Sequence, residues 1–297
     1  MSAIFVNSAE KRCGIHQYGL RIYTNIKDIL QIDYAEVSNV AEYIVAVAGH
    51  KKVLINYYCS LFYYLDVSNQ DADKEYYYLY HEAHFYNVRP GPHLNNDPTR
   101  ADGIPRPIAF ANEVSYSLTN TEHPVIGSFG FGFLNKNFHE LIDLVQSQFD
   151  KATIRLLMPG AYWGDEDAQE ARQSAELCRR KITKPGIQLW ICHNFLSNED
   201  LLTFLGGNDL NVFLYQPFPN RGCSSVIDYA LGVNRPLAIS ESDMFRHIYD
   251  DRICVSKTPL RTIIQNGPEI NARFRQMWSK DALALSIQKR LDLPYKG

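Results

Sequence analysis

Short apolar runs alternate with stretches of helical periodicity along the first part of the chain. Four of these runs have the length of a buried strand and lie at residues 3–7, 32–37, 52–58 and 76–81. Between the first two, apolar residues recur at every fourth position from Tyr18 to Leu30, as on one face of a helix. A shorter helix is expected at residues 40–48. Strands that alternate with helices predict βαβ units and a parallel sheet.

The same alternation starts again near residue 124. Five strands are expected at residues 124–128, 153–158, 188–192, 211–215 and 236–240. The helices expected between and after them lie at residues 138–145, 165–180, 197–205, 223–231, 242–248 and 270–291, the last in two pieces. The predicted fold class is therefore α/β, with two successive doubly wound halves.

A polar stretch rich in proline separates the two halves. Residues 87–107 hold five prolines, which indicates a functional loop or a mobile connection with room for one short irregular strand. Residues 113–123 are polar and poor in helix formers. We therefore expect a first domain at residues 1–118 and a second that begins at residue 119.

The stretch from Val125 to Val145, VIGSFGFGFLNKNFHELIDLV, combines a strand, a glycine-bearing turn and an amphipathic helix. Its glycines, Gly130 and Gly132 among them, allow a tight turn and a close approach of the backbone to a ligand. The first turn of a helix presents unpaired N–H groups and the positive end of its dipole, and Lys136 stands just before it. Two interpretations stay open on these residues alone, a plain strand-to-helix turn and a seat for a diphosphate.

Composition narrows the functions that the chain can have. Of 297 residues, 45% are hydrophobic and 21% charged, and the net charge of −3 argues against a nucleic-acid-binding protein. The six cysteines are scattered without a CxxC pair, which predicts reduced thiols in a cytoplasmic protein and no metal site. No apolar run approaches the length of a membrane span, so only peripheral membrane contact is left open.

The motifs of the second half resemble, in order, the C-terminal domain of GT-B glycosyltransferases, especially those of family 4. The glycine turn with Lys136 resembles the family's glycine-rich loop and its lysine on the donor diphosphate. The segment PFPNRGCSSVIDYALGVNRP, residues 217–236, is similar to the family's signature block. The likeness implies two Rossmann-like domains facing across a cleft, the second at residues 119–275, with a helix at 276–297 that crosses back to the first.

The resemblance implies a donor site in the second domain. Its residues would come from the glycine turn, from the end of a later strand and from the signature block: Gly130, Gly132, Lys136, His193, Asn194, Arg221, Gly222, Ser224, Ser225 and Asp228. Lys136, Arg221 and helix N–H groups would stabilise the leaving diphosphate. One of the two serines is also expected to cap the helix that follows them.

The first domain would take the acceptor. Cys13, Gly14 and His16 follow the first strand, where they form either a flexible turn or a backbone cradle for an anion. His81 and Glu82 end the fourth strand, and His81 resembles the family's cleft histidine. We therefore predict catalytic roles for His81, Lys136 and Arg221, with a purely structural histidine as the alternative for His81.

Two departures from the family pattern concern charge. The family's block carries two glutamates eight positions apart, where this chain has Arg221 and Tyr229. The arginine that usually stands a few residues before the lysine is absent, and Arg221 is the candidate to replace its charge.

The predicted function is transfer of a sugar from a UDP- or GDP-linked donor to a glycan, lipid-linked or other hydroxyl acceptor, as in polysaccharide biosynthesis. The resemblance implies a retaining reaction. No metal is expected, on the ground that no Asp-X-Asp pattern is present, and no cofactor is expected. The missing glutamates favour, as the alternative, a protein that binds a nucleotide-sugar or glycan without turnover. The few carboxylates in the predicted loops argue against a nucleotide-sugar epimerase, and the acidic pI of about 6.3 argues against a glycosyltransferase acting on DNA bases.

Overall fold

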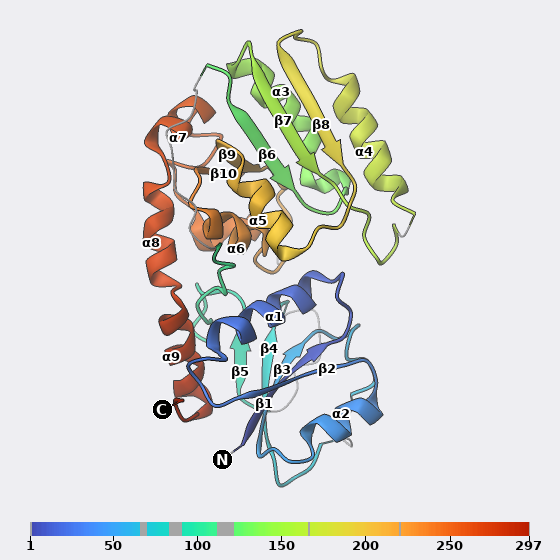
Figure 1. The fold of residues 1–297 in the computed structure, drawn as a ribbon, viewed down its shortest axis with the longest axis vertical. Coiled ribbons are helices and arrows are strands. Elements are labelled where there is room, and N and C mark those ends of the chain that lie inside the picture. Colours follow the sequence, from blue (N-terminus) through green and yellow to red (C-terminus); the bar gives the residue numbers. More distant parts are fainter. Residues whose placement is uncertain are drawn as a thin grey trace. The chain divides into compact units, whose positions relative to one another are not determined.

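The fold is described here from a computed structural model, for residues 2–65, 70–82, 91–111, 122–165, 167–219 and 221–296 (Figure 1). The chain forms two compact units. The first comprises Met1–Ile108, Asn220–Cys223 and Met277–Gly297, and the second comprises Ala109–Pro219 and Ser224–Gln276. The domain boundary predicted at residues 118 and 119 lies outside the described residues.

The first unit is built on a parallel sheet of five strands in the order β2-β1-β3-β4-β5. Four strands lie where the apolar runs predicted them, and β5 falls in the proline-rich stretch, where room was left for a short strand. The elements are β1 (Ala3–Ser8), α1 (Gly14–Ile26), β2 (Asp33–Val37), α2 (Val40–Val47), β3 (Lys52–Tyr57), β4 (Glu75–Tyr80) and β5 (His93–Asn95), joined by the last helix of the chain, α9 (Lys280–Leu291).

Each face of this sheet buries its own apolar cluster. Successive side chains of a strand point to opposite faces, so Phe5 of β1 packs with α1 and α9 while Val6 packs with α2. The chain between residues 57 and 80, rich in tyrosine, contributes to the second cluster, in which Tyr57, Tyr78 and Tyr80 are buried. These tyrosines therefore form part of the core.

The second unit repeats the plan with a parallel sheet in the order β10-β9-β6-β7-β8. Helices α3, α4 and α7 pack on one face, and α5 and α6 on the other. The elements are β6 (Val125–Phe129), α3 (Phe138–Gln148), β7 (Ala152–Leu157), α4 (Gln169–Arg180), β8 (Ile187–Cys192), α5 (Asn198–Gly206), β9 (Leu210–Phe213), α6 (Val226–Ala230), β10 (Leu237–Ile239), α7 (Leu260–Asn266) and α8 (Glu269–Met277).

Among the described residues of this unit there are also three short 3₁₀ helices: η2 (Leu134–Lys136), η3 (Leu231–Val233) and η4 (Asp243–Ile248). The helix predicted at residues 223–231 is shorter than expected, because α6 begins only at Val226 and passes into η3 at Leu231. The final helical region is interrupted, as predicted, between α8 and α9. Among the described helices, none has the length and apolar character needed to cross a membrane.

A buried lysine fixes the last helix onto the first unit. The Lys52 ammonium donates hydrogen bonds to the carbonyl oxygens of Leu291 (2.6 Å) and Asp292 (3.1 Å), at the carboxyl end of α9. Only 4% of Lys52 is exposed. A cation at the carboxyl end of a helix bonds carbonyls that lack a partner within the helix and also interacts favourably with the helix dipole.

We expect Lys52→Met to destabilise the first unit by about 1–3 kcal/mol, because it leaves buried carbonyls without a donor. Amide hydrogen exchange in the last turn of α9 should become faster, and the thermal midpoint should fall. The exposed neighbour Lys51 provides the control, since Lys51→Met should change neither quantity. Equal effects of the two variants would show that the Lys52 contact does not hold α9.

Candidate functional site

The candidate site in the second unit forms where β6 and β9 end side by side. The two strands are parallel neighbours, with Gly127 opposite Asn211, so their carboxyl ends open toward the same edge of the sheet. After β6 the chain turns at Gly130, whose φ of +152° favours glycine, and then enters η2, which ends at Lys136. This edge of a parallel sheet is where α/β proteins bind their ligands.

Lys136 lies against Tyr215, which follows β9. Its ammonium is 3.6 Å from the centroid of the Tyr215 ring, a cation–π contact. Burial raises the pKa of Tyr215, and a hydrogen bond with the Ser224 side chain acts in the opposite direction. Three predicted donor-site residues, Gly130, Lys136 and Ser224, are thus joined through a tyrosine that the sequence reasoning did not single out. Its position directly after a buried strand was the available signal.

The loop that carries Lys136 is fixed from two sides. Asn137, in the left-handed conformation at φ 54°, donates from its side chain to Leu214 O at 2.8 Å, and Gln216 N donates to Asn135 O at 2.9 Å. Gly132 N donates to Pro159 O at 3.1 Å. A Cβ at Gly132 would lie 2.4 Å from the backbone of Ala171 in α4, so the loop needs glycine to approach this helix.

The start of α6 differs from the prediction. Ser225 occupies the N-cap position but makes no side-chain capping bond, because its backbone is already helical at φ −78° and ψ −6°. The side chain of Ser224 is engaged by Tyr215 instead. The expected serine cap is therefore wrong.

Asp228, a candidate ribose ligand, is fully buried, and the Tyr229 hydroxyl donates to the Asn198 side chain at 2.8 Å.

His193 and Asn194 stand at the end of β8. His193 Nδ1 bonds Met158 O at 2.8 Å, which links this loop to the one after β7, while Asn194 is exposed. Beside them lies an aromatic cluster that the sequence reasoning missed, made of Phe131, Trp163 and Phe195 with rings 4.8 Å and 6.4 Å apart. Three separate loops supply it, so local sequence gives no signal for it.

Arg221 and Gly222 belong to the first unit, although their neighbours in sequence belong to the second. Arg221 Nε lies 3.0 Å from the Glu82 carboxylate, which is 11% exposed. A Cβ at Gly222 would lie 2.4 Å from His81 O, so the backbone packs directly on the end of β4. The structure therefore joins predicted donor residues to predicted acceptor-side residues, and it pairs the Arg221 charge with a carboxylate.

His81 is buried and bonded at both ring nitrogens. Nε2 donates to Asn56 Oδ1 at 2.8 Å, and Nδ1 accepts from Asn96 Nδ2 at 3.1 Å. Burial, together with the charges of Arg106 and Arg21, lowers the pKa of His81 to about 3. The ring is therefore neutral at physiological pH, and both nitrogens are already engaged. The catalytic role predicted for His81 stays a prediction.

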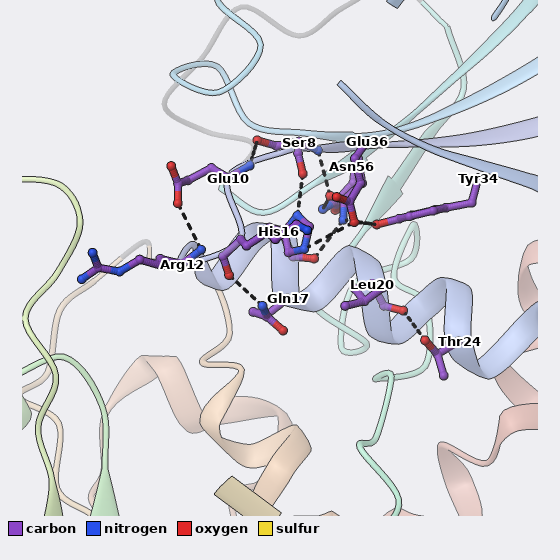
Figure 2. A network of polar contacts seen from close by, with 12 residues as sticks. Ser8, Glu10, Arg12, His16, Gln17, Leu20, Thr24, Tyr34, Glu36 and Asn56 are labelled. Carbon is purple, nitrogen blue, oxygen red and sulfur yellow. Dashed lines mark hydrogen bonds and ion pairs between the residues drawn. The ribbon is translucent and has the colours of Figure 1, made fainter. Parts of the chain in front are cut away.

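The remaining acceptor-side residues form the first turn of α1 (Figure 2). Cys13 is the N-cap, and its sulfur accepts from Ile15 N at 3.4 Å. His16 is 1% exposed; its Nδ1 bonds Ser8 O at 2.5 Å, and its Nε2 lies 3.7 Å from Glu36. Cys13, Gly14 and His16 are thus brought together as predicted, with the thiol engaged as a cap.

The sequence holds two Asp-X-Asp patterns, at residues 71–73 and 165–167, so the expectation that none is present is wrong. Such pairs can hold a cation. Asp165, in the second unit, is 5% exposed and accepts from Glu170 N and Ala171 N, so it fixes the start of α4. Asp71, in the first unit, accepts from Asp73 N and lies 3.8 Å from the Lys74 ammonium. The first carboxylate of each pair is thus engaged by the chain itself.

Solved structures match nearly the whole chain. HepE from Anabaena, solved with UDP and glucose, has a TM-score of 0.72 and 13% identity over 98% of this chain and 99% of its own. Sucrose-phosphate synthase from Thermosynechococcus elongatus has a TM-score of 0.64 and 10% identity over 97% and 98%. AviGT4, a glycosyltransferase involved in avilamycin A biosynthesis, has a TM-score of 0.61 and 10% identity over 98% and 97%. No protein-family model and no curated protein matches the chain in sequence.

Two parallel five-stranded sheets flanked by helices, matched over their full length, decide the architecture. The chain has the GT-B fold. This confirms the α/β class and the two doubly wound halves predicted from the sequence. In this GT-B chain, the second unit carries Lys136 at the carboxyl edge of its sheet, and the first unit carries the end of β4 and the first turn of α1.

We expect Gly132→Ala to destabilise the second unit of this GT-B chain by about 1–3 kcal/mol, the usual cost of overpacking. The new methyl group would overlap the backbone of α4, and a backbone cannot move aside as a side chain can. Thermal unfolding measures the effect. Gly49→Ala is the matched control, because nothing lies within 4 Å of its added Cβ. A Gly132 variant as stable as the Gly49 variant would contradict the described packing.

Proposed function

We propose that the protein is a glycosyltransferase that moves a sugar from a nucleotide-sugar to a hydroxyl acceptor. The observation that carries the proposal is the placement of Lys136 at the carboxyl edge of the second sheet, held between the glycine turn and Tyr215. Support also comes from HepE, which was solved with UDP-glucose and shares the fold. We extend the donor class to this chain as a nucleoside diphosphate sugar.

The proposed chemistry rests on charge and position. Breaking the bond between the sugar and the diphosphate leaves negative charge on the leaving oxygen, and a preorganised cation beside it lowers the barrier. Lys136 would supply that cation, and backbone N–H groups at the start of α3 would bind the remaining phosphate oxygens. Holding donor and acceptor together would supply the rest of the rate enhancement.

The proposal has three finer features, of which only retention of configuration comes from the resemblance to family 4. They are retention of configuration, independence from metal, and a place in glycan or polysaccharide biosynthesis. Gly130, Gly132, Ser224 and Ser225 would line the phosphates, and His193 and Asn194 the base. Arg221, paired with Glu82, would act from the first unit. His81 and the turn at Cys13–His16 would belong to the acceptor side.

A second candidate function is binding of a nucleotide-sugar without turnover. The observation that favours it is that Arg221 and Tyr229 stand where the family carries its two glutamates, and that the Tyr229 hydroxyl is bonded within the second unit. Thermal shift with UDP, GDP and their glucose and mannose conjugates would reveal the donor. Release of free UDP or GDP from the sugar-linked compound, with and without alcohols and saccharides as acceptors, then separates transfer from binding alone.

We expect Lys136→Met to weaken binding of the preferred nucleoside diphosphate by about 10-fold to 100-fold, the range for losing one charged contact. Isothermal titration calorimetry at two salt concentrations measures the loss and should show a weaker salt dependence in the variant. Lys151→Met, which removes an exposed lysine at the opposite end of β7, is the control and should bind as the wild type does. Unchanged binding in the Lys136 variant would refute the assignment of Lys136 to the diphosphate-binding site.

A further inference from the structure

Three buried asparagines and His81 form a continuous chain of hydrogen bonds in the first unit, which we call the amide ladder: Asn7, Asn56, His81 and Asn96. Asn56 accepts from His81 Nε2 and donates to Asn7 Oδ1 at 2.9 Å. All four residues are at most 6% exposed. They come from the ends of β1 and β3 and from the residues that directly follow β4 and β5, so the ladder crosses the carboxyl edge of four strands.

The amide ladder also bonds the first turn of α1. Asn56 Nδ2 donates to Ile15 O at 2.8 Å, and Asn7 Nδ2 donates to His16 O at 2.9 Å. These carbonyls therefore gain side-chain donors. Gly19 lets the helix come this close, because a Cβ there would lie 2.5 Å from Asn56 Nδ2. The ladder thus connects the turn at Cys13–His16 to the end of β4.

The direction of every bond in the ladder follows from a neutral His81. With the proton on Nε2, Nδ1 accepts from Asn96 Nδ2, and each bond between two members of the ladder has one donor and one acceptor. Asn96 Oδ1, at the end of the ladder, has no hydrogen-bond partner among the described residues. A second proton on Nδ1 would face the Asn96 donor. The charged groups near His81, Arg106 and Arg21, also oppose protonation. Tyr18 packs edge-on against the ring at 5.0 Å.

The ladder reaches both groups of predicted acceptor-side residues. Asn7 and Asn56 bond the turn that holds Cys13, Gly14 and His16. His81 precedes Glu82, whose carboxylate is paired with Arg221. Buried polar networks gain most when every member is bonded, and they specify one arrangement where an apolar core tolerates several. A ladder at the ligand-binding edge of the sheet is therefore suited to keep two separate pieces of a site in register.

We propose that the amide ladder positions the acceptor side of the site, with Asn56 and Asn96 as positioning residues and His81 as their neutral hub. The inference rests on the proposed glycosyl transfer. In it, His81 acts through its neighbours: it fixes the end of β4, and with it the Glu82 carboxylate, against the first turn of α1.

The test uses Asn56→Asp in the full chain, a change that keeps the shape of the side chain. The carboxylate still accepts from His81, but it cannot donate to Asn7 Oδ1 or Ile15 O. Asn271→Asp is the matched control, because Asn271 is a similarly buried amide in α8 of the second unit that donates to Arg235 O. Both variants lose a buried amide, so both should be less stable than the wild type. Thermal unfolding curves therefore identify a temperature at which both variants are folded, and the other measurements are made at that temperature.

Nitrogen NMR of histidine-labelled protein reads the ladder directly, with His81→Gln to assign the signal. In the wild type and in Asn271→Asp, His81 should stay neutral and protonated on Nε2 from pH 8 down to about 5, a behaviour consistent with a pKa of about 3. In Asn56→Asp the ring should titrate at higher pH, because the new carboxylate favours the charged form. Amide exchange in the first turn of α1 should be roughly 10-fold faster in that variant alone.

Measurements of UDP binding and of turnover test the functional part of the proposal. UDP affinity should be unchanged in both variants, while release of UDP from UDP-glucose, with water or octyl β-glucoside as acceptor, should fall about 10-fold to 100-fold in Asn56→Asp only. If the two variants show the same His81 titration and the same amide exchange rates, the ladder is refuted. If turnover is unchanged in Asn56→Asp, the positioning role of the ladder is refuted. If the wild-type protein releases no UDP from UDP-glucose, transfer from this donor is refuted, and with it the role of the ladder in positioning that reaction. The NMR and amide-exchange measurements still test whether the ladder itself forms as described.

Discussion

The parallel pairing of β6 with β9 is the contact on which the candidate donor site depends. It joins segments more than 80 residues apart, with Ile126 opposite Leu210 and Gly127 opposite Asn211. Gly127 is required there, since a Cβ would lie 1.9 Å from the Asn208 side chain. Asn208 in turn bonds Arg155 of β7 at 3.0 Å, which secures the centre of the sheet. Because the register of the two strands is fixed, the residues that follow them lie at the same edge of the sheet. Lys136, after β6, therefore contacts Tyr215, after β9.

The two ends of the first sheet carry different polar chemistry. At the amino end of β3, Lys52 bonds the carbonyls at the end of α9 and so serves stability. At the carboxyl end, asparagines bond one another, His81 and the first turn of α1. An amide is both donor and acceptor, so a row of asparagines can continue from strand to strand, whereas a lysine ends every chain of bonds that it enters.

The hydrophobic pattern predicted the strands well because burial on a parallel sheet needs a short apolar run, which is a local property. β5, with three residues inside a polar stretch, has too little apolar sequence to stand out, and the pattern could only leave room for it. The serine cap was wrong because Ser225, at the N-cap position of α6, already has helical backbone angles, and the Ser224 side chain bonds Tyr215 instead. The aromatic cluster and the amide ladder escaped notice because their members come from separate loops and strands. Residue type alone does not indicate which of them meet.

Lys136 and Arg221, the two predicted cations, have different electrostatic surroundings, and this difference is why the donor site is proposed at Lys136. Arg221 faces the Glu82 carboxylate at 3.0 Å, so much of its charge is balanced by its own unit. Lys136 rests on the face of Tyr215, and burial keeps the tyrosine hydroxyl protonated, so the ring attracts the ammonium without neutralising it. The cation–π contact therefore fixes where the Lys136 ammonium lies. In the proposed donor site this one fixed cation would serve where the family has both an arginine and a lysine, and Arg221 would act on the end of β4 through Glu82.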